Sequence, residues 1–75
     1  MYSLYCNVIC LTKLYFIKDS SNNYLCLGSL TLQNVKDILI MLPVAGVHYE
    51  TDLGELIITF NSIEELVYNY PELFI

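Results

Sequence analysis

The clearest pattern of apolar and polar positions lies near the end of the chain, over residues 62–70. Apolar residues recur there at the spacing of one helix face: Ile63, Leu66, Val67 and Tyr70. Ser62 and Glu65 occupy the two positions of a capping box, which satisfies backbone N–H groups of the first helical turn. Pro71 cannot continue the helix. The sequence therefore predicts a capped amphipathic helix that ends at about residue 70.

The first 17 residues show a different period. Even positions from 4 to 16 form a nearly continuous apolar row, whereas the odd positions include Asn7 and Lys13. A period of two predicts a long strand, which bends or splits between Asn7 and Thr12. A helix over residues 4–15 also fits, because apolar residues there can form a helical stripe. Strand and helix both stay open for residues 1–13.

The middle of the chain predicts a hairpin followed by a helix. The polar cluster Asp19–Asn23 is typical of a turn, and Tyr24–Leu27 can return from it as a short strand, so residues 14–27 form the hairpin. Thr31 can cap the helix that follows, and Pro43 is expected to end it. The inward positions of this helix are Leu32, Val35, Leu39 and Leu42.

The second half repeats this order. Residues 44–50 are expected to form a strand, residues 51–54 a turn and residues 55–60 a returning strand, directly before the helix at 62–70. A shift of 31 residues aligns Thr31 with Ser62 and Leu32 with Ile63. We therefore predict one α+β domain of two hairpin–helix units, about 4–43 and 44–75, in ββαββα order. Its antiparallel sheet of about four strands carries both helices on one face, which makes two layers.

Alternation along the strands assigns the two faces of this sheet. The face expected under the helices carries Leu14, Phe16, Leu25, Leu27, Val47, Tyr49, Leu56, Ile58 and Phe60. The opposite face carries Lys13, Tyr15, Ile17, Tyr24, Cys26, His48, Ile57 and Thr59. Because two helices cannot cover both faces, the second face is predicted to be open. Its candidate binding residues for a partner or a second copy are Tyr15, Ile17, Tyr24, His48 and Ile57.

Composition and charge narrow the class of partner. Hydrophobic residues make up 56% of the 75 residues, against about 45–50% in soluble chains, which predicts an exposed apolar patch. Residues 1–44 have a net charge of +1, whereas residues 45–75 carry six acidic residues and no Lys or Arg. The chain therefore lacks the basic surface needed for direct nucleic-acid binding. A protein with a basic surface suits the acidic half better, although these acids can also serve only as a solvated surface.

Candidate chemistry is sparse. Cys6, Cys10 and Cys26 fit neither a disulfide framework nor a metal or redox spacing, and Cys26 is the thiol expected on the open face. His48 is the only histidine. Its nearest predicted neighbours include Glu50 and Glu55, with which it could form at most a weak metal or proton site, whereas a single His on a strand is more often a surface or interface residue. Glu64 and Glu65 complement the dipole of their helix. We therefore expect no catalytic residue, metal or cofactor.

The apolar start of the chain does not predict a targeting or membrane segment. No positive charge precedes it, no small-residue cleavage site follows it, and Asn7 and Lys13 interrupt it. We expect a cytoplasmic protein with reduced cysteines, without membrane association.

Seven tyrosines favour a role in recognition, since tyrosine offers large contact area with little loss of rotamer freedom. The exposed side of the last helix is expected to form an acidic, aromatic ridge of Glu64, Glu65, Tyr68, Asn69 and Glu72. In size, acidity and lack of catalytic motifs the chain resembles the small inhibitors that phages and mobile elements encode against host defence proteins, including anti-CRISPR proteins. That resemblance implies a stoichiometric blocker of a basic surface.

Three functional hypotheses follow. The first is a non-enzymatic protein-binding domain or inhibitor, and the second is a self-associating domain that forms a homodimer through the open sheet face. The third, an enzyme that uses His48 or Cys26, has the least support in the sequence.

Overall fold

A computed structural model describes residues 1–45 and 53–74 of the chain, with the side chains of residues 1–42 and 53–74. The elements follow one another as β1 (Tyr2–Ile9), β2 (Thr12–Lys18), β3 (Tyr24–Leu27), α1 (Leu32–Ala45), β4 (Glu55–Phe60), α2 (Ile63–Asn69) and the 3-10 helix η1 (Pro71–Phe74). The predicted α+β class, with four antiparallel strands and two helices, is confirmed. The predicted ββαββα order is wrong, because three strands precede α1.

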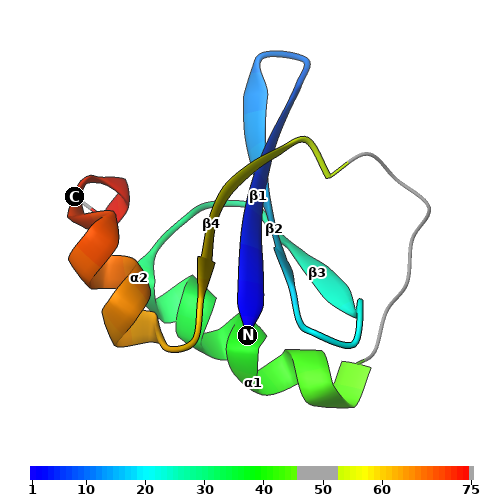
Figure 1. The fold of residues 1–75 in the computed structure, drawn as a ribbon. Helices are drawn as coiled ribbons and strands as arrows, with labels where there is room; N and C mark the ends of the chain where they lie inside the picture. The colour runs from blue at the N-terminus through cyan, green and yellow to red at the C-terminus, as the bar shows by residue number, and fades with distance from the viewer. Residues whose placement is uncertain (46–52, 75) are drawn as a thin grey trace.

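The four strands form one antiparallel sheet in the order β3-β2-β1-β4 (Figure 1). The split predicted between Asn7 and Thr12 is confirmed, and the alternative helix over residues 4–15 is wrong. Ile9 pairs with Thr12 across a two-residue turn, in which Cys10 has a φ of 52° and Leu11 a φ of 65°. Two consecutive positive φ angles define a type I′ turn, whose twist matches that of a hairpin.

The predicted hairpin at residues 14–27 is confirmed as β2 and β3. Its loop is closed by Asp19, whose side chain accepts backbone N–H hydrogen bonds from Ser21 at 2.9 Å and Asn23 at 3.0 Å. Lys18 and Tyr24 form the last strand pair, so the loop between them has five residues. This odd number sets the register of the hairpin: Ile17 lies opposite Leu25.

β4 completes the sheet as the second neighbour of β1. Leu4 lies opposite Ile58, but the next residue, Tyr5, lies opposite Leu56. One residue of β4, Ile57, is therefore extra, which is a β-bulge. The bulge moves Leu56 to the face opposite the helices, where Leu56 is 49% exposed.

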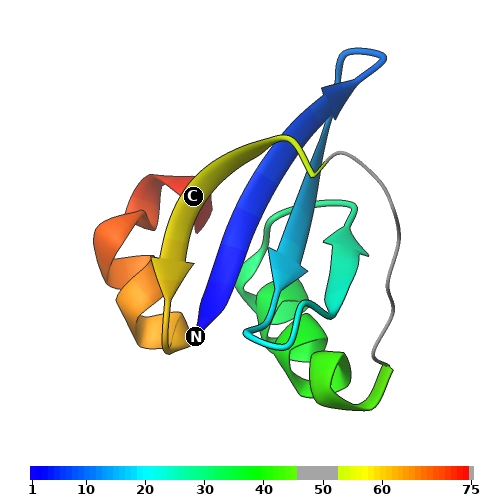
Figure 2. The ribbon, with the colours of Figure 1, turned by 45° about the vertical axis from the view of Figure 1, so that its right-hand side comes forward.

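Both helices pack on the same face of the sheet. α1 packs on β2 and β3, and α2 packs on β4 (Figure 2). The shared core between the layers consists of Leu4, Ile17, Leu27, Val35, Ile38, Leu42, Phe60 and Leu66. The capping predicted for the first helix is confirmed, since Thr31 Oγ1 accepts from the N–H of Asn34 at 3.1 Å. The predicted end at Pro43 is wrong, because α1 continues through Ala45.

The face assignment is partly wrong. Leu25, Leu27, Ile58 and Phe60 do lie toward the helices, as predicted. Phe16 does not: it lies opposite Tyr5 and Cys26, on the other face. The cause is the five-residue loop of the β2–β3 hairpin, which pairs odd residues of β2 with odd residues of β3. The predicted strand at 44–50 begins with two residues that belong to α1, and its remainder, including Val47 and Tyr49, lies outside the described residues.

Candidate functional site

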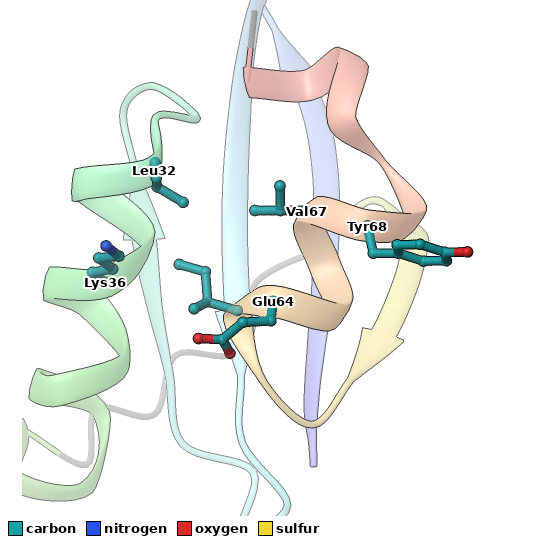
Figure 3. Close-up of a pocket in the computed structure, with 6 residues that line it drawn as sticks. Leu32, Lys36, Glu64, Val67 and Tyr68 are labelled. Atoms are coloured by element: carbon teal, nitrogen blue, oxygen red, sulfur yellow. The ribbon is translucent and has the colours of Figure 1, made fainter.

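An open groove lies between α1 and α2. It has a volume of about 430 Å³ and is lined by Leu32, Lys36, Ile63, Glu64, Val67 and Tyr68. We call this set the helix groove (Figure 3). Its volume falls in the usual range of ligand sites, about 300–1,000 Å³.

The helix groove has an apolar floor. Leu32 comes from α1 and Ile63 and Val67 from α2, and Figure 3 shows Leu32 and Val67 directed toward each other across the gap. Leu32 is 41% exposed although it belongs to the predicted inward face of its helix. In the single chain these apolar groups are partly exposed to water, so burying them against a partner would be favourable.

Local hydrogen bonds fix the start of α1, and therefore the position of Leu32. The amide group of Asn34 donates to the hydroxyl oxygen of Ser29 at 2.9 Å and to its backbone carbonyl at 3.1 Å. Together with the Thr31 cap, these bonds connect the first turn of α1 to the loop that precedes it. Gln33, in the same first turn, donates to Asp37, one turn further along the exposed side of the helix, at 2.8 Å.

The start of α2 is held by the predicted cap. The Oγ of Ser62 accepts from the N–H of Glu65 at 3.3 Å, and Glu65 Oε2 accepts from the N–H of Asn61 at 2.9 Å. The carboxylate thus reaches one residue further back than in the standard capping box, where it meets the N-cap residue. At the other end, the hydroxyl of Tyr70 donates to the carbonyl of Ile57 at 3.4 Å and joins the helix end to β4.

The lining of the helix groove carries one charge of each sign, on Lys36 and Glu64, whereas the chain segment that includes α2 is acidic. Residues 53–74 carry four glutamates and no Lys or Arg. The carboxylate of Glu64 is directed toward α1, which carries Lys36 on the other side of the groove (Figure 3). The carboxylate of Glu64 at the edge of an apolar floor suits a ligand that combines an apolar group with a positive charge.

The predicted acidic ridge is divided by the structure. Glu64 and Tyr68 line the helix groove, and Tyr68 is 86% exposed with its ring directed away from α1 (Figure 3). Glu65 is engaged in the cap, and Asn69 donates to the backbone carbonyl of Glu65 at 3.0 Å. Glu72 is exposed but belongs to η1, after the helix has ended. Glu64 and Tyr68 are thus the members that the groove brings together.

The residues predicted to form an open sheet face do not share one exposed face in the structure. Ile17 is fully buried under the helices, and Tyr15 and Ile57 pack against the same core. Their predicted placement on an open face is wrong, because of the hairpin register and the β-bulge. Tyr24 does lie on the face opposite the helices, but only 5% of it is exposed. His48 lies outside the described residues.

The face opposite the helices carries its own aromatic contacts. Phe16 and Tyr24 pack edge to face with ring centroids 6.3 Å apart. The ammonium of Lys18 lies 5.4 Å from the centroid of the Tyr5 ring, a cation–π contact. Leu56 and Cys26 are both exposed on this face.

A second surface escaped the sequence analysis: the tip of the β1–β2 hairpin, residues 8–13. The hairpin extends past the ends of β3 and β4 (Figure 1). Its apolar side chains face solvent: Val8 is 59% exposed, Ile9 47% and Leu11 98%. Cys10, in the turn itself, is exposed. The two-residue turn contains neither Asn nor Gly, so no typical turn residue marks it in the sequence. The alternation of apolar and polar residues does not show where the turn lies.

The sequence alone did not predict that Leu32 and Lys36 lie beside the last helix. One signal was present, since the 31-residue shift aligns Leu32 with Ile63, the first residue of each helix. Leu32 and Ile63 both line the helix groove.

Within 1–45 and 53–74, no group of three or more His, Cys, Asp or Glu residues could hold a metal ion. Although Cys26 is exposed as a residue, partial burial of its thiol raises the pKa of Cys26, which lowers its thiolate fraction. The Sγ of Cys26 lies 3.8 Å from the carbonyl oxygen of Leu27, to which it donates weakly.

Comparisons with known proteins give no family for this chain. No protein-family model, no curated protein and no solved structure matches it. A separate search of the described residues finds no helix with the length and apolar character needed to cross a membrane.

Proposed function

We propose that this protein is a non-enzymatic protein-binding domain and that the helix groove is its binding site. The observation that carries the proposal is the combination of an apolar floor, formed by Leu32, Ile63 and Val67, with the acidic segment that borders it. The fitting ligand is a segment of another protein that inserts an apolar side chain and carries Lys or Arg beside it.

The shape of the groove favours a polypeptide over a small metabolite. Small-molecule sites enclose most of their ligand, whereas this groove lies open between two helices on the surface (Figure 3). Its few polar groups stand at the rim, on Lys36, Glu64 and Tyr68. Apolar anchors at the centre and polar groups around them are the usual arrangement of a protein interface.

The acidic surface supports a more specific version of this proposal. A binder with four glutamates and no base in residues 53–74 is suited to a basic target. An inhibitor that covers the basic surface of a host defence protein, as anti-CRISPR proteins do, is a binder of this kind. The three free cysteines suit a reducing compartment, and we assign the protein to the cytoplasm.

Selection from a displayed random-peptide library tests the proposal, because it does not require an identified partner. Peptides selected on the immobilised protein are expected to share an apolar residue next to Lys or Arg. Val67→Lys places a cation in the groove and should abolish binding, while the last turn of α2 tolerates a positive charge. Leu56→Lys, on the opposite face, is the matched control and should bind as the native protein does. Selected peptides that lack basic residues, or that bind Val67→Lys equally well, would overturn the proposal.

A further inference from the structure

The tip of the β1–β2 hairpin exposes apolar side chains to solvent and takes no part in the hydrophobic core. Leu11 is 98% exposed at its end, and Val8 and Ile9 flank it. Both turn residues, Cys10 and Leu11, adopt a left-handed backbone, which residues other than Gly, Asn and Asp rarely visit. Backbone strain of this kind concentrates at functional positions.

The same molecule carries a second exposed apolar surface. The helix groove presents Leu32, Ile63 and Val67 as an open apolar floor. The tip lies at the end of the sheet far from α1, in both ribbon views (Figures 1 and 2). The hairpin of one chain therefore cannot enter its own groove while β1 and β2 remain paired.

Charge complements the apolar match. Residues 1–18 carry Lys13 and Lys18 and no acidic residue, whereas residues 53–74 carry four glutamates and no base. Lys13 is exposed and pairs with Val8 across the hairpin, next to the tip. In a second copy, Glu64 stands at the rim of the groove. Lys36 lines the opposite, α1 side of the groove, so the attraction requires Lys13 to approach the α2 side, where Glu64 stands.

We propose that the hairpin tip of one copy binds in the helix groove of a second copy. Two such contacts, related by a two-fold axis, close a dimer. The contact also occupies the site of the proposed function, so self-association and partner binding compete. This regulatory consequence rests on the proposed function, whereas the contact itself does not.

A membrane is the other occupant that an apolar hairpin tip could have. The net charge of −5 opposes binding to anionic lipid, and Lys13 is the only cation at the tip. The charge pattern therefore favours the groove of a second copy, where Glu64 stands at the rim.

A mixing experiment with two variants tests the contact. Leu11→Asp removes the apolar anchor but leaves the groove, and Val67→Lys blocks the groove but leaves the hairpin. Sedimentation velocity from micromolar to millimolar concentration should show self-association of the native chain. Each variant alone alters both contacts of the dimer, so its dissociation constant should rise by about a hundredfold or more, as expected for two lost apolar anchors. An equimolar mixture should form a complex, because one intact hairpin meets one intact groove.

Two further measurements make the result decisive. Cys10→Asn with Leu11→Gly supplies the residues that a type I′ turn favours, so this variant folds but has no anchor, and it should stay monomeric. Leu56→Asp should associate as the native chain does. A native chain that is monomeric throughout, a mixture that forms no complex, or association lost only in Leu56→Asp would each overturn the proposal. Tip-dependent binding of the native chain to anionic vesicles, with no self-association, would assign the tip to a membrane and overturn it too.

This experiment separates the two proposals. Leu11→Asp frees the groove, so peptides selected under the proposed function should bind it at least as tightly as they bind the native chain. Self-association without any selected peptide would refute the proposed function alone. A peptide that binds an entirely monomeric native chain would refute the hairpin contact alone.

Discussion

Gly54 lies directly against the backbone carbonyl oxygen of Cys6. A Cβ atom at residue 54 would overlap that oxygen and lie 2.7 Å from the Cα of Asn7, and the φ of Gly54 is 83°. Both the contact and the backbone conformation therefore require glycine at the point where the chain enters β4. This close approach fixes the start of the edge strand against β1.

Gly54→Ala should lower the free energy of unfolding by about 2–4 kcal/mol, because it adds a steric overlap to an unfavourable φ. Urea unfolding followed by circular dichroism measures the change. Gly28→Ala is the matched control, since nothing lies within 4 Å of a Cβ built there. Equal stability of the two variants would contradict this description of the β4 entry.

Ile17 tests the observed register of the sheet. Ile17→Ala should cost about 2–5 kcal/mol, because the side chain is fully buried under the helices. Ile40→Ala should change stability by less than about 0.5 kcal/mol, since Ile40 is 74% exposed. If Ile17→Ala is as harmless as Ile40→Ala, the residue lies on an open face after all.

The turn at Cys10 and Leu11 stores strain that substitution can release. Replacing both residues by Asn and Gly should raise the free energy of unfolding by about 1–2 kcal/mol, because these residues adopt positive φ at lower cost. Thermal and urea unfolding provide the measurement. A double variant less stable than the native chain would show that the apolar tip stabilises the fold itself, which its exposure argues against.

Glu65 and Glu64 are adjacent acids with different roles. Glu65→Ala should cost about 1 kcal/mol, because the N–H of Asn61 loses its carboxylate partner. Glu64→Ala removes only an exposed charge and should stay within about 0.5 kcal/mol. In binding to a basic peptide the order should reverse, with Glu64→Ala the more damaging change. Equal effects of both substitutions on stability would contradict the cap geometry.

The raised pKa of Cys26 predicts slow alkylation. The thiolate is the nucleophile, so a pKa above the ordinary thiol value lowers the reactive fraction. With iodoacetamide at about pH 8, Cys10 at the exposed turn should react before Cys26. Mass spectrometry of the labelled peptides gives the two rates. Because the folded state holds the thiol proton more tightly, alkaline pH should also favour unfolding as it passes from the ordinary to the raised pKa.

The sequence predicted the elements whose signals are local. The Ser62 cap, the Asp19–Asn23 turn and the Thr31 cap each involve residues close together in the chain, and each is found in the structure. Which face of the sheet a strand residue occupies depends instead on whether the residues that pair across the strands are at odd or even positions. One additional loop residue, or a bulge at Ile57, moves every following side chain to the other face. Alternation alone does not encode either feature.

The candidate site was predicted only in part for a related reason. Glu64 and Tyr68 belong to one short amphipathic segment, which the sequence shows directly. Their neighbours Leu32 and Lys36 are about 30 residues away and join them only because both helices pack on one face. The projecting tip at Leu11 depends on where β3 and β4 end, which follows from pairing and not from the composition of the hairpin.

The central claim is that another polypeptide binds between α1 and α2. The most direct measurement is NMR titration of isotopically labelled Leu11→Asp protein with a peptide from the library selection. Amide shifts should move at Leu32, Ile63 and Val67 and stay constant at Cys26 and Leu56 on the opposite face. Shifts confined to Cys26 and Leu56, with the groove residues unmoved, would contradict the assignment of the helix groove as the binding site.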